Sequence, residues 1–374
     1  MKVIMVGGGT GGHIYPAIAI AEAIQDKKIN SQILFIGSED GIETKIVPQE
    51  RFSLVTIKSR GMLRKLSYKA ISSPFFAIAG FFQAIGIIKN FMPDVIIATG
   101  GFVSFPVVCA AFILRKPVML YEGNVTPGLT ARICKWLSTR IVVAFEQSRR
   151  YYRWRKVFAV GGPVRREVLK AVKGISIQNL NLRQDKKIVL ILGGSQGARS
   201  INKVIVESLQ ELEKLNIQLI HVCGERDFEW IKKETAAIDN SFYRLIPYMQ
   251  NIWDGLAAAD LVISRAGATV ISEILARGVP SILIPFPFSA GKHQDINAET
   301  LQKEGAAVVI KDSRLNKDDL ISEIRSILNS RETTQKIIDA CKKLSKPNAA
   351  NDIVNIIFNM LGMDLYARKR KTKK

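Results

Sequence analysis

The chain has 374 residues, of which 47% are hydrophobic and 23% charged, and it carries a formal net charge of +21. This composition excludes disordered and fibrous proteins, and the length favours two domains over one. The four cysteines have no Cys-x-x-Cys spacing, which argues against a zinc site and a disulfide framework. The longest apolar stretch, residues 74–88, contains Gln83 and falls short of the ~18 apolar residues of a spanning helix. We therefore expect no export signal and a protein that is soluble or peripheral to a membrane.

The positive charge is concentrated in the first half of the chain and at its end. Residues 51–93 contain no acidic residue, and residues 367–374 form a basic tail. A positive field on one domain implies an anionic partner for it: nucleic acid, anionic lipid or a phosphorylated substrate. A surface of solvated lysines is the alternative, and it explains the tail better than it explains the first half.

Two segments share one design along the chain. Residues 2–13 read as an apolar strand, a glycine turn and the start of a helix, and residues 187–212 repeat that order. The other predicted strands are 32–36, 94–98, 118–121 and 141–144 in the first half, and 219–223, 261–264, 281–284 and 307–310 in the second. Repeated strand–helix units in both halves predict two doubly wound α/β domains.

The boundary between these domains is expected near residues 161–163. The first domain would then comprise residues 1–163 and the second residues 164–350. A last amphipathic helix, 351–361, could pack back on the first domain.

The first glycine turn, Gly7-x-Gly9-x-x-Gly12, satisfies the dinucleotide fingerprint. The acidic residue that should close the second strand is missing there, because Glu39 lies beyond that strand. His13 follows the glycines in the first turn of a helix, where it could accept a proton from a substrate hydroxyl. A helix-capping histidine is the alternative, and the position beside the glycine turn favours a function.

The second glycine turn, residues 193–197, offers the Ser195 hydroxyl and backbone amides to a diphosphate. A tight turn that merely needs glycine fits equally well. In residues 264–273 a strand ends in small residues, and the following helix carries Glu273, whose carboxylate could bind two ribose hydroxyls.

A loop–helix junction at residues 285–297 carries His293, Gln294 and Asn297. Three such side chains suit a sugar with hydroxyl and acetamido groups. A capped surface helix is the weaker alternative.

Taken together, these segments resemble the MurG family of bacterial N-acetylglucosaminyltransferases, which convert lipid I to lipid II. The likeness runs from Gly7 to about Phe358 and is carried by residues 8–16, 99–106, 193–197, 265–273 and 293–297. The resemblance implies an α/β GT-B fold, that is, two doubly wound Rossmann-like domains with a cleft between them. It places the lipid acceptor on the first domain and UDP-GlcNAc on the second.

The resemblance also implies a set of binding residues. Those at the cleft and on the sugar, the uracil, the diphosphate and the ribose are Thr10, Gly11, Gly12, Asn124, Arg165, Ser195, Ile246, Ala268, Thr269, Glu273 and Gln294. Gly123 and Gly162 stand where the family usually has an amide side chain, so contacts there should differ.

For catalysis we expect His13 to be the base that activates the acceptor hydroxyl, with Glu122 in reserve. A single displacement with inversion would give a β-1,4 link. The sequence has no Asp-x-Asp motif, and we expect no metal and no other cofactor. Helix N-termini and backbone amides would stabilise the departing charge instead. The expected partners are UDP-GlcNAc, lipid I and an anionic membrane surface, with no nucleic acid.

Three alternatives remain open from the residues. A nicotinamide-dependent oxidoreductase would rest on the first glycine turn alone, and an RNA-binding protein on the net charge and on residues 149–156, where arginine alternates with aromatics. A related GT-B enzyme could glycosylate another lipid, such as a diacylglycerol.

The location follows from a basic segment, residues 58–65, beside the apolar residues 74–82. An apolar patch with a cationic rim binds an anionic leaflet, so we expect a peripheral protein on the cytoplasmic face of the cell membrane. The phenylalanines at 75, 76, 81 and 82 should include exposed side chains, because a helix cannot bury every position of such a run. Ala77, Ala84 and Ile88 should face the sheet.

Overall fold

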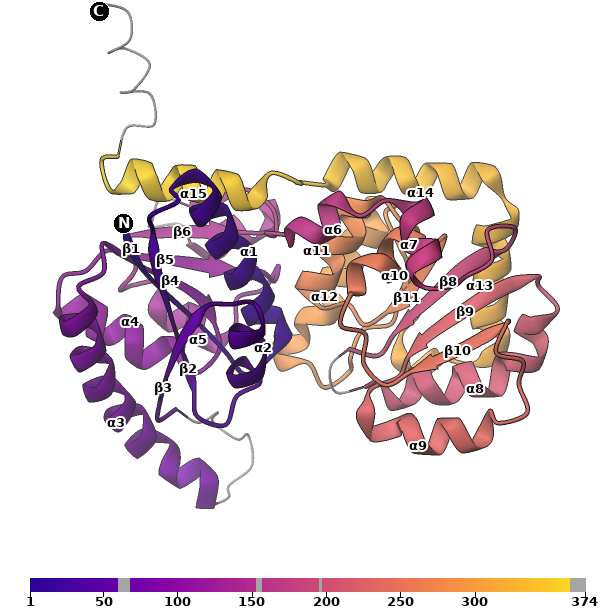
Figure 1. Cartoon of the computed structure of the whole chain (residues 1–374), viewed down its shortest axis with the longest axis horizontal. Helices are drawn as coiled ribbons and strands as arrows, with labels where there is room; N and C mark the ends of the chain where they lie inside the picture. Colours follow the sequence, from indigo (N-terminus) through magenta and orange to yellow (C-terminus); the bar gives the residue numbers. More distant parts are fainter. Residues whose placement is uncertain (60–67, 153–156, 195–196, 364–374) are drawn as a thin grey trace, which may run out of the picture. The chain divides into compact units, whose positions relative to one another are not determined.

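The computed structural model describes residues 1–59, 68–152, 157–194 and 197–363 (Figure 1). The chain forms two compact units. The first unit comprises Met1–Arg165 and Asn348–Lys374, and the second comprises Arg166–Pro347. The chain thus leaves the first unit after Arg165 and returns to it at Asn348.

The first unit contains a parallel sheet of seven strands within the described residues. Its strands are β1 (Lys2–Gly7), β2 (Gln32–Ser38), β3 (Ser53–Ile57), β4 (Val95–Gly100), β5 (Val118–Glu122), β6 (Arg140–Val143) and β7 (Val157–Ala159). Their order across the sheet is β3-β2-β1-β4-β5-β6-β7. The winding direction reverses between β1 and β4, and in doubly wound sheets ligands bind at the carboxyl ends of the strands at such a point.

Helices cover both faces of this sheet. They are α1 (Gly11–Lys27), α2 (Glu43–Gln49), α3 (Tyr68–Phe91), α4 (Ser104–Ile113), α5 (Leu129–Cys134), the 3₁₀ helix η1 (Glu146–Tyr152) and α15 (Ala349–Met360). Successive residues of β1 face opposite sides, as the pleat requires. Val3 and Met5 pack with α1, α2 and α15, whereas Ile4 and Val6 pack with α3, α4 and α5. Both faces are therefore apolar, which explains the run without alternation.

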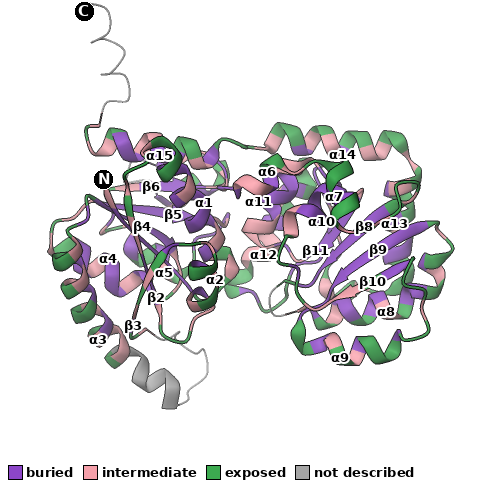
Figure 2. Ribbon diagram, viewed as in Figure 1, coloured by how far each residue is buried: buried purple, intermediate pink, exposed green. Residues whose placement is uncertain are grey.

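The last helix completes the core of the first unit. Ile353, Val354, Ile357 and Phe358 of α15 are buried in the same cluster as the inner side of α1 (Figures 1 and 2). Lys27 at the end of α1 donates to Asn355 Oδ1 at 2.6 Å.

The second unit repeats the design with a parallel sheet of six strands among the described residues. Its strands are β8 (Lys187–Leu192), β9 (Ile217–Val222), β10 (Tyr243–Ile246), β11 (Leu261–Ser264), β12 (Ser281–Leu283) and β13 (Val308–Val309), in the order β10-β9-β8-β11-β12-β13. The winding direction reverses between β8 and β11.

The helices of the second unit follow the same alternation with its strands. They are α6 (Arg166–Lys170), α7 (Lys173–Asn179), α8 (Arg199–Glu213), α9 (Glu225–Glu234), α10 (Ile252–Ala258), α11 (Ala268–Arg277), η2 (Ala290–Lys292), α12 (His293–Lys303), η3 (Asp312–Arg314), α13 (Lys317–Asn329) and α14 (Arg331–Leu344). Helix α8 packs against α9 and α13, and α10 packs against α6, α7 and α11.

Besides β1 and β8, all eight strands predicted from the sequence form, and their ends differ from the predicted ones by at most two residues. Strands β3, β7 and β10 were not expected. Each is an edge strand of its sheet, so it needs no continuous apolar run. Strand β3, for example, alternates between exposed and more buried residues. No helix within the described residues is both long enough and apolar enough to cross a bilayer.

Candidate functional site

The first glycine turn joins β1 to α1 at the reversal point of the first sheet. Gly9 has a φ of +82°, which favours glycine, and α1 begins at Gly11 with no side-chain cap. Thr10, Gly11 and Gly12 therefore lie at the amino end of a 17-residue helix, where the helix dipole favours negative charge.

His13 is oriented by the neighbouring strand β4. Its Nδ1 lies 3.0 Å from the carbonyl oxygen of Thr99, and Thr99 Oγ1 donates to the carbonyl of His13 at 2.8 Å. Because a carbonyl only accepts, Nδ1 carries the proton when the ring is neutral. Nε2 is then the ring nitrogen that can accept a proton, which is the state a general base needs.

The bend after β4 has to be glycine. Gly100 and Gly101 have φ values of +115° and +83°. A Cβ at Gly100 would overlap the His13 ring, and one at Gly101 would overlap the carbonyl of Gly8. These two glycines thus let the β4 bend lie directly against both His13 and the glycine turn.

Glu122 ends β5, and its buried carboxylate holds the loop that follows. Oε1 accepts from the backbone N–H of Asn124 at 2.9 Å and from its Nδ2 at 3.0 Å, and Oε2 accepts from the N–H of Gly128 at 3.1 Å. Burial raises the pKa of Glu122, and these hydrogen bonds and the charge of Arg132 oppose the rise. Asn124 is partly exposed, and its carbonyl accepts from Ser148 Oγ at 3.1 Å.

Arg165 is the last residue of the first segment of the first unit, before the chain enters the second unit, and it lies against α1. Its guanidinium is 4.1 Å from the centre of the Tyr15 ring, and its side chain is buried. The first unit therefore gathers Thr10, His13 and Arg165 around the start of α1.

In the second unit, Gly193, Gly194 and Gly197 surround the turn after β8. Ser195 lies outside the described residues. Gly193 N–H donates to the carbonyl of Val222 at 2.9 Å, and Gly194 and Gly197 have φ values of +75° and +74°. A Cβ at Gly197 would lie 2.6 Å from the carbonyl oxygen of Cys223, so this turn packs directly against the residue that follows β9.

A buried polar network supports this turn from behind. Asn202 Nδ2 donates to the carbonyl of Cys223 and to Asp227 Oδ2, both at 2.9 Å. Its Oδ1 accepts from Nε2 of His221 at 2.9 Å, and Nδ1 of His221 accepts from the hydroxyl of Tyr243 at 2.8 Å. Burial lowers the pKa of His221 to about 3, although Asp227 acts in the opposite direction, so the ring is neutral near pH 7.

Arg265 fixes the turn after β11. Its guanidinium pairs with Asp312 and donates to the Ile284 carbonyl at 3.1 Å and to Ser200 Oγ at 2.8 Å. Ser200 in turn donates to Asp312 at 2.6 Å. This clamp ties four segments together just before α11 begins at Ala268.

The residues expected on the ribose and the phosphate lie along α11. Ala268 and Thr269 form its partly exposed first turn, and Glu273 follows on the same helix with its side chain buried. Ile246 lies apart from α11, at the end of β10. It is partly exposed, and its carbonyl accepts from the N–H of Cys223 at 3.0 Å.

The three polar residues at the start of α12 have different environments. Asn297 is fully buried and donates to the carbonyl of Ala266 at 3.2 Å, so it ties α12 to the turn after β11. Gln294 is partly exposed, and its Oε1 accepts from the N–H of Phe286 at 2.9 Å. His293 Nδ1 lies 2.7 Å from the carbonyl of Ala290. Gln294 and His293 thus face solvent in part, whereas Asn297 is structural.

The comparison with protein families accounts for most of the chain. Residues 3–143 match the N-terminal domain of glycosyltransferase family 28, and residues 188–353 match its C-terminal domain. The chain belongs to glycosyltransferase family 28. Family membership removes the oxidoreductase and the RNA-binding alternatives.

Several family members are similar over their whole length. Proteins from Thermoanaerobacter sp. (strain X514) and Halothermothrix orenii are 41% and 40% identical, over 96% of this chain and 99% and 98% of theirs. Both are named UDP-N-acetylglucosamine--N-acetylmuramyl-(pentapeptide) pyrophosphoryl-undecaprenol N-acetylglucosamine transferase. The crystal structure of Acinetobacter baumannii MurG is 25% identical, with a TM-score of 0.72 over 96% of this chain and 99% of that one. The predicted MurG resemblance and GT-B fold are thereby confirmed.

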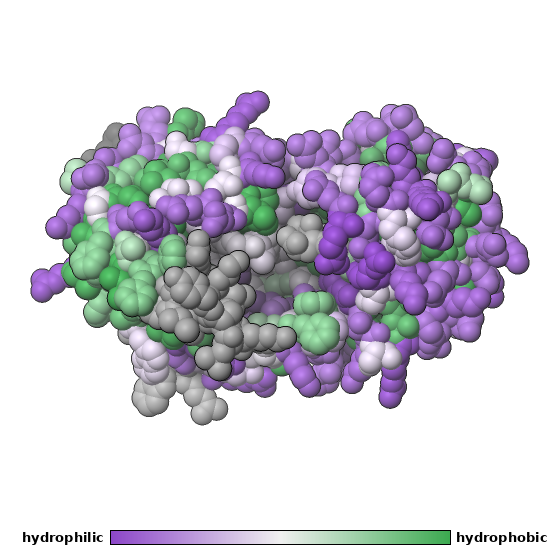
Figure 3. Space-filling model, turned by 90° about the horizontal axis from the view of Figure 1, so that it is seen from below, coloured by the Kyte–Doolittle hydropathy of each residue, from purple (hydrophilic) through white to green (hydrophobic). Residues whose placement is uncertain are grey.

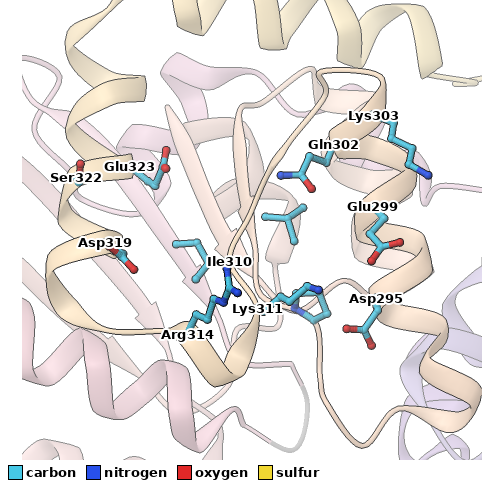
Figure 4. A pocket seen from close by; sticks show the side chains of 12 residues that line it. Asp295, Glu299, Gln302, Lys303, Ile310, Lys311, Arg314, Asp319, Ser322 and Glu323 are labelled. Carbon is cyan, nitrogen blue, oxygen red and sulfur yellow. The ribbon is translucent and has the colours of Figure 1, made fainter.

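The second unit contains a cavity of about 650 Å³ (Figure 4). Side chains from α12, from β13 and the η3 segment after it, and from α13 surround it, among them Asp295, Glu299, Lys311, Arg314 and Glu323. None of the predicted site residues lines it. No cluster of three or more His, Cys, Asp or Glu side chains in the described ranges is arranged to hold a metal ion.

Several residues that shape these turns were not predicted from the sequence. Ser200 and Asp312 hold Arg265, and Asn202 and His221 hold the turn after β8. Glu43 holds the first glycine turn. No local sequence pattern identifies them. Glu43 does follow the predicted strand 32–36, as Glu39 does, and this position is a weak signal for a polar residue near the glycine turn.

Proposed function

We propose that this protein transfers N-acetylglucosamine from UDP-GlcNAc to the C4 hydroxyl of N-acetylmuramic acid in lipid I, which forms lipid II for peptidoglycan. The observation that carries the proposal is the full-length likeness, at about 40% identity, to transferases named for this donor and acceptor. The orientation of His13 also supports the proposal, because it leaves Nε2 as the ring nitrogen that accepts the proton of the acceptor hydroxyl.

The reaction is a single displacement. The C4 oxygen of the acceptor attacks the anomeric carbon of GlcNAc while the bond from that carbon to the β-phosphate oxygen breaks, so UDP leaves and the configuration inverts. The hydroxyl proton goes to Nε2 of His13, because Nδ1 is committed to the Thr99 carbonyl. Glu122 is the reserve base, but its two oxygens already accept three hydrogen bonds from their own loop. We therefore assign Glu122 to holding Asn124, which would contact the sugar.

We assign the donor chiefly to the second unit. Amides at the start of α11, at Ala268 and Thr269, together with the turn that contains Ser195, would hold the diphosphate and stabilise the charge of departing UDP. Glu273 would bind the ribose hydroxyls and Gln294 the hydroxyls of GlcNAc. Ile246 would contact the uracil.

Residues of the first unit would complete the substrate contacts. Thr10, Gly11 and Gly12 would lie close to donor and acceptor phosphates, because the start of α1 favours negative charge. Arg165 is assigned to the uracil end of the donor. Its stacking on Tyr15 reduces the freedom of the guanidinium before substrate arrives.

We further propose that the first unit rests on the cytoplasmic face of an anionic membrane. Helix α4 packs against both α3 and α5, and all three helices expose large apolar side chains. Hydrophobic residues gather on the surface of this unit in Figure 3. The exposed residues on these helices and directly after α5 are Phe75, Ile78, Phe82, Phe112, Ile113, Leu129, Ile133 and Trp136. Single exposed apolar residues are common, whereas a group of this kind marks an interaction surface.

Cations accompany this apolar surface. Arg115 and Arg132 are exposed beside it, and Lys135 lies over the ring of Trp136 at 5.1 Å. Each Lys or Arg near an anionic leaflet contributes roughly 1 kcal/mol to binding. Most of the basic segment 58–65 lies outside the described residues.

A donor-competition assay with purified protein tests the proposed activity. Transfer of labelled GlcNAc to a soluble lipid I analogue should be measured with UDP-GlcNAc, UDP-glucose and UDP-galactose competing. We expect UDP-GlcNAc to be preferred at least 10-fold, because only it offers the acetamido group. Absence of transfer to the lipid I analogue, or equal use of the three donors, would contradict the proposal.

A further inference from the structure

The carboxylate of Glu43 lies inside the first glycine turn. Glu43 is the first residue of α2 and is fully buried. Its Oε2 accepts from the N–H of Gly9 at 3.0 Å, and its Oε1 accepts from the N–H and the hydroxyl of Ser38 at 2.8 Å and 2.6 Å. A buried carboxylate is costly unless it is hydrogen-bonded, and here donors from two loops stabilise it.

Three glycines make room for this carboxylate. A Cβ at Gly8 or at Gly41 would overlap the carboxylate, and one at Gly37 would lie 2.5 Å from its Cγ. The glycine at position 8 therefore makes room for a side chain of the protein itself. The Gly9 amide, which a dinucleotide phosphate would need, is already occupied by Glu43.

The turn that Glu43 holds supports the bend beside His13. The carbonyl of Gly8 lies so close to Gly101 that a Cβ there would overlap it. The adjoining Gly100 lies against the His13 ring, and the carbonyl of Thr99 orients Nδ1 of that ring. Glu43 is thus connected to His13 through the glycine turn and the β4 bend, all within the first unit.

We propose that Glu43 is a positioning residue for His13, which fixes the glycine turn and thereby the tautomer and orientation of the ring. This inference rests on the proposed function only for its kinetic consequence. Small misplacements of a reacting group can lower turnover about 100-fold, even when the altered residue does not touch substrate. Loss of Glu43 should therefore act on kcat and leave donor binding in the second unit intact.

Glu43→Gln tests the inference, because the amide has the size of the carboxylate but only one oxygen that accepts hydrogen bonds. Its NH₂ group must face either the N–H of Gly9 or the donors of Ser38, so one of these contacts is lost. We expect kcat to fall roughly 10- to 100-fold, with the donor KM within about twofold of the parent. Glu39→Gln is the matched control, since Glu39 is exposed on the same loop and should leave kcat unchanged.

A second readout does not depend on activity. The chain has three histidines, and ¹⁵N-histidine NMR reports which ring nitrogen carries the proton. In the parent, His13 should show the Nδ1–H tautomer and His221 the opposite one, so His221 is an internal reference. In Glu43→Gln the His13 pattern should move away from the Nδ1–H form, while the His221 pattern stays unchanged.

An unchanged His13 pattern together with parental kcat in Glu43→Gln would overturn the inference. If that variant does not fold, Ser38→Ala removes one of the three donors to the carboxylate, and the same two unchanged readouts would overturn it. If the parent itself lacks transferase activity, the proposed function fails, and the NMR pattern still decides whether Glu43 positions His13.

Discussion

At the scale of single residues, the chemistry depends on which hydrogen bond each side chain has already made. His13 directs Nδ1 to a carbonyl and so keeps Nε2 as its acceptor, whereas Glu122 uses both oxygens on its own loop. Both residue types can act as bases. Their partners assign the proton transfer to His13 and a structural task to Glu122.

His13→Ala should lower kcat by about 10²- to 10⁴-fold, the range usual for loss of a general base. UDP affinity, measured by calorimetry, should stay within about twofold, because we assign UDP binding chiefly to the second unit. Turnover near that of the parent would remove His13 from the role of base.

Glu273→Ala should raise the donor KM about 10-fold or more and change kcat by less than about threefold. A carboxylate on ribose hydroxyls binds ground and transition states alike, so its loss affects binding and spares the chemical step. Steady-state kinetics with UDP-GlcNAc as the varied substrate checks this, with Glu273→Gln as the isosteric companion. An unaltered donor KM in both variants would show that Glu273 only packs in α11.

His221 should make stability depend on pH. Burial lowers its pKa to about 3 in the folded chain, against about 6.5 when unfolded. Between these values the unfolded chain binds the extra proton, so the free energy of unfolding should fall by about 1.4 kcal/mol per pH unit as pH decreases. The free energy of unfolding, measured with urea, should be plotted against pH for His221→Gln and for the parent. Below pH 6.5 the plot for His221→Gln should be shallower than that of the parent, and above pH 7.5 the two plots should have the same slope. Equal slopes of the two plots below pH 6.5 would contradict a lowered pKa for His221.

At the scale of elements, α3 shows how one apolar helix serves two purposes. Ala84 and Ile88 are fully buried against the sheet, as expected, while Ala77 is partly exposed. Phe75 and Phe82 are 73% and 65% exposed, which confirms that the run cannot be buried on every side. One face of α3 therefore stabilises the fold and the other is available to a membrane.

The double change Phe75→Ser and Phe82→Ser should weaken binding to phosphatidylglycerol vesicles by about 10-fold or more, measured by sedimentation. Binding of the parent should also weaken with salt, because cations near the surface contribute. Phe288→Ser is the matched control, since Phe288 is 79% exposed in the second unit and should leave vesicle binding unchanged. Equal binding to phosphatidylcholine and phosphatidylglycerol vesicles would contradict an anionic membrane partner.

At the scale of the whole molecule, the chain builds two units and crosses between them twice. Each unit has its own parallel sheet with its own reversal point. Helix α15 belongs to the first unit although more than half of the chain separates it from β7. The first unit is therefore complete only after the second has been synthesised.

Calorimetry should resolve this organisation as two unfolding transitions. UDP at 100 times its Kd should stabilise chiefly the second unit, by raising its free energy of unfolding by about 2.7 kcal/mol. Ile357→Ala should destabilise only the first unit, by about 2–5 kcal/mol, because Ile357 is fully buried in its core. Ile324→Ala, at a fully buried position of α13, is the matched change in the second unit. A single transition that both variants lower equally would contradict two independent units.

The sequence by itself determined the fold class, the strands buried on both faces, the glycine turns and the family. These features depend on local order, because a continuous apolar run followed by glycines predicts a buried strand and its turn wherever it occurs. The edge strands β3, β7 and β10 were missed because they are incompletely buried and leave a weaker pattern.

Only the tertiary structure decided which polar side chains are free for chemistry. The carboxylate of Glu43 points at the first glycine turn, whereas Glu39 is exposed. Asn297 is buried and supports the turn after β11, whereas Gln294 is partly exposed. The tertiary structure also selected the tautomer of His13 through a carbonyl 86 positions away in the chain. Hydrogen-bond partners of this kind are set by the packing of distant strands, so no local pattern in the sequence records them.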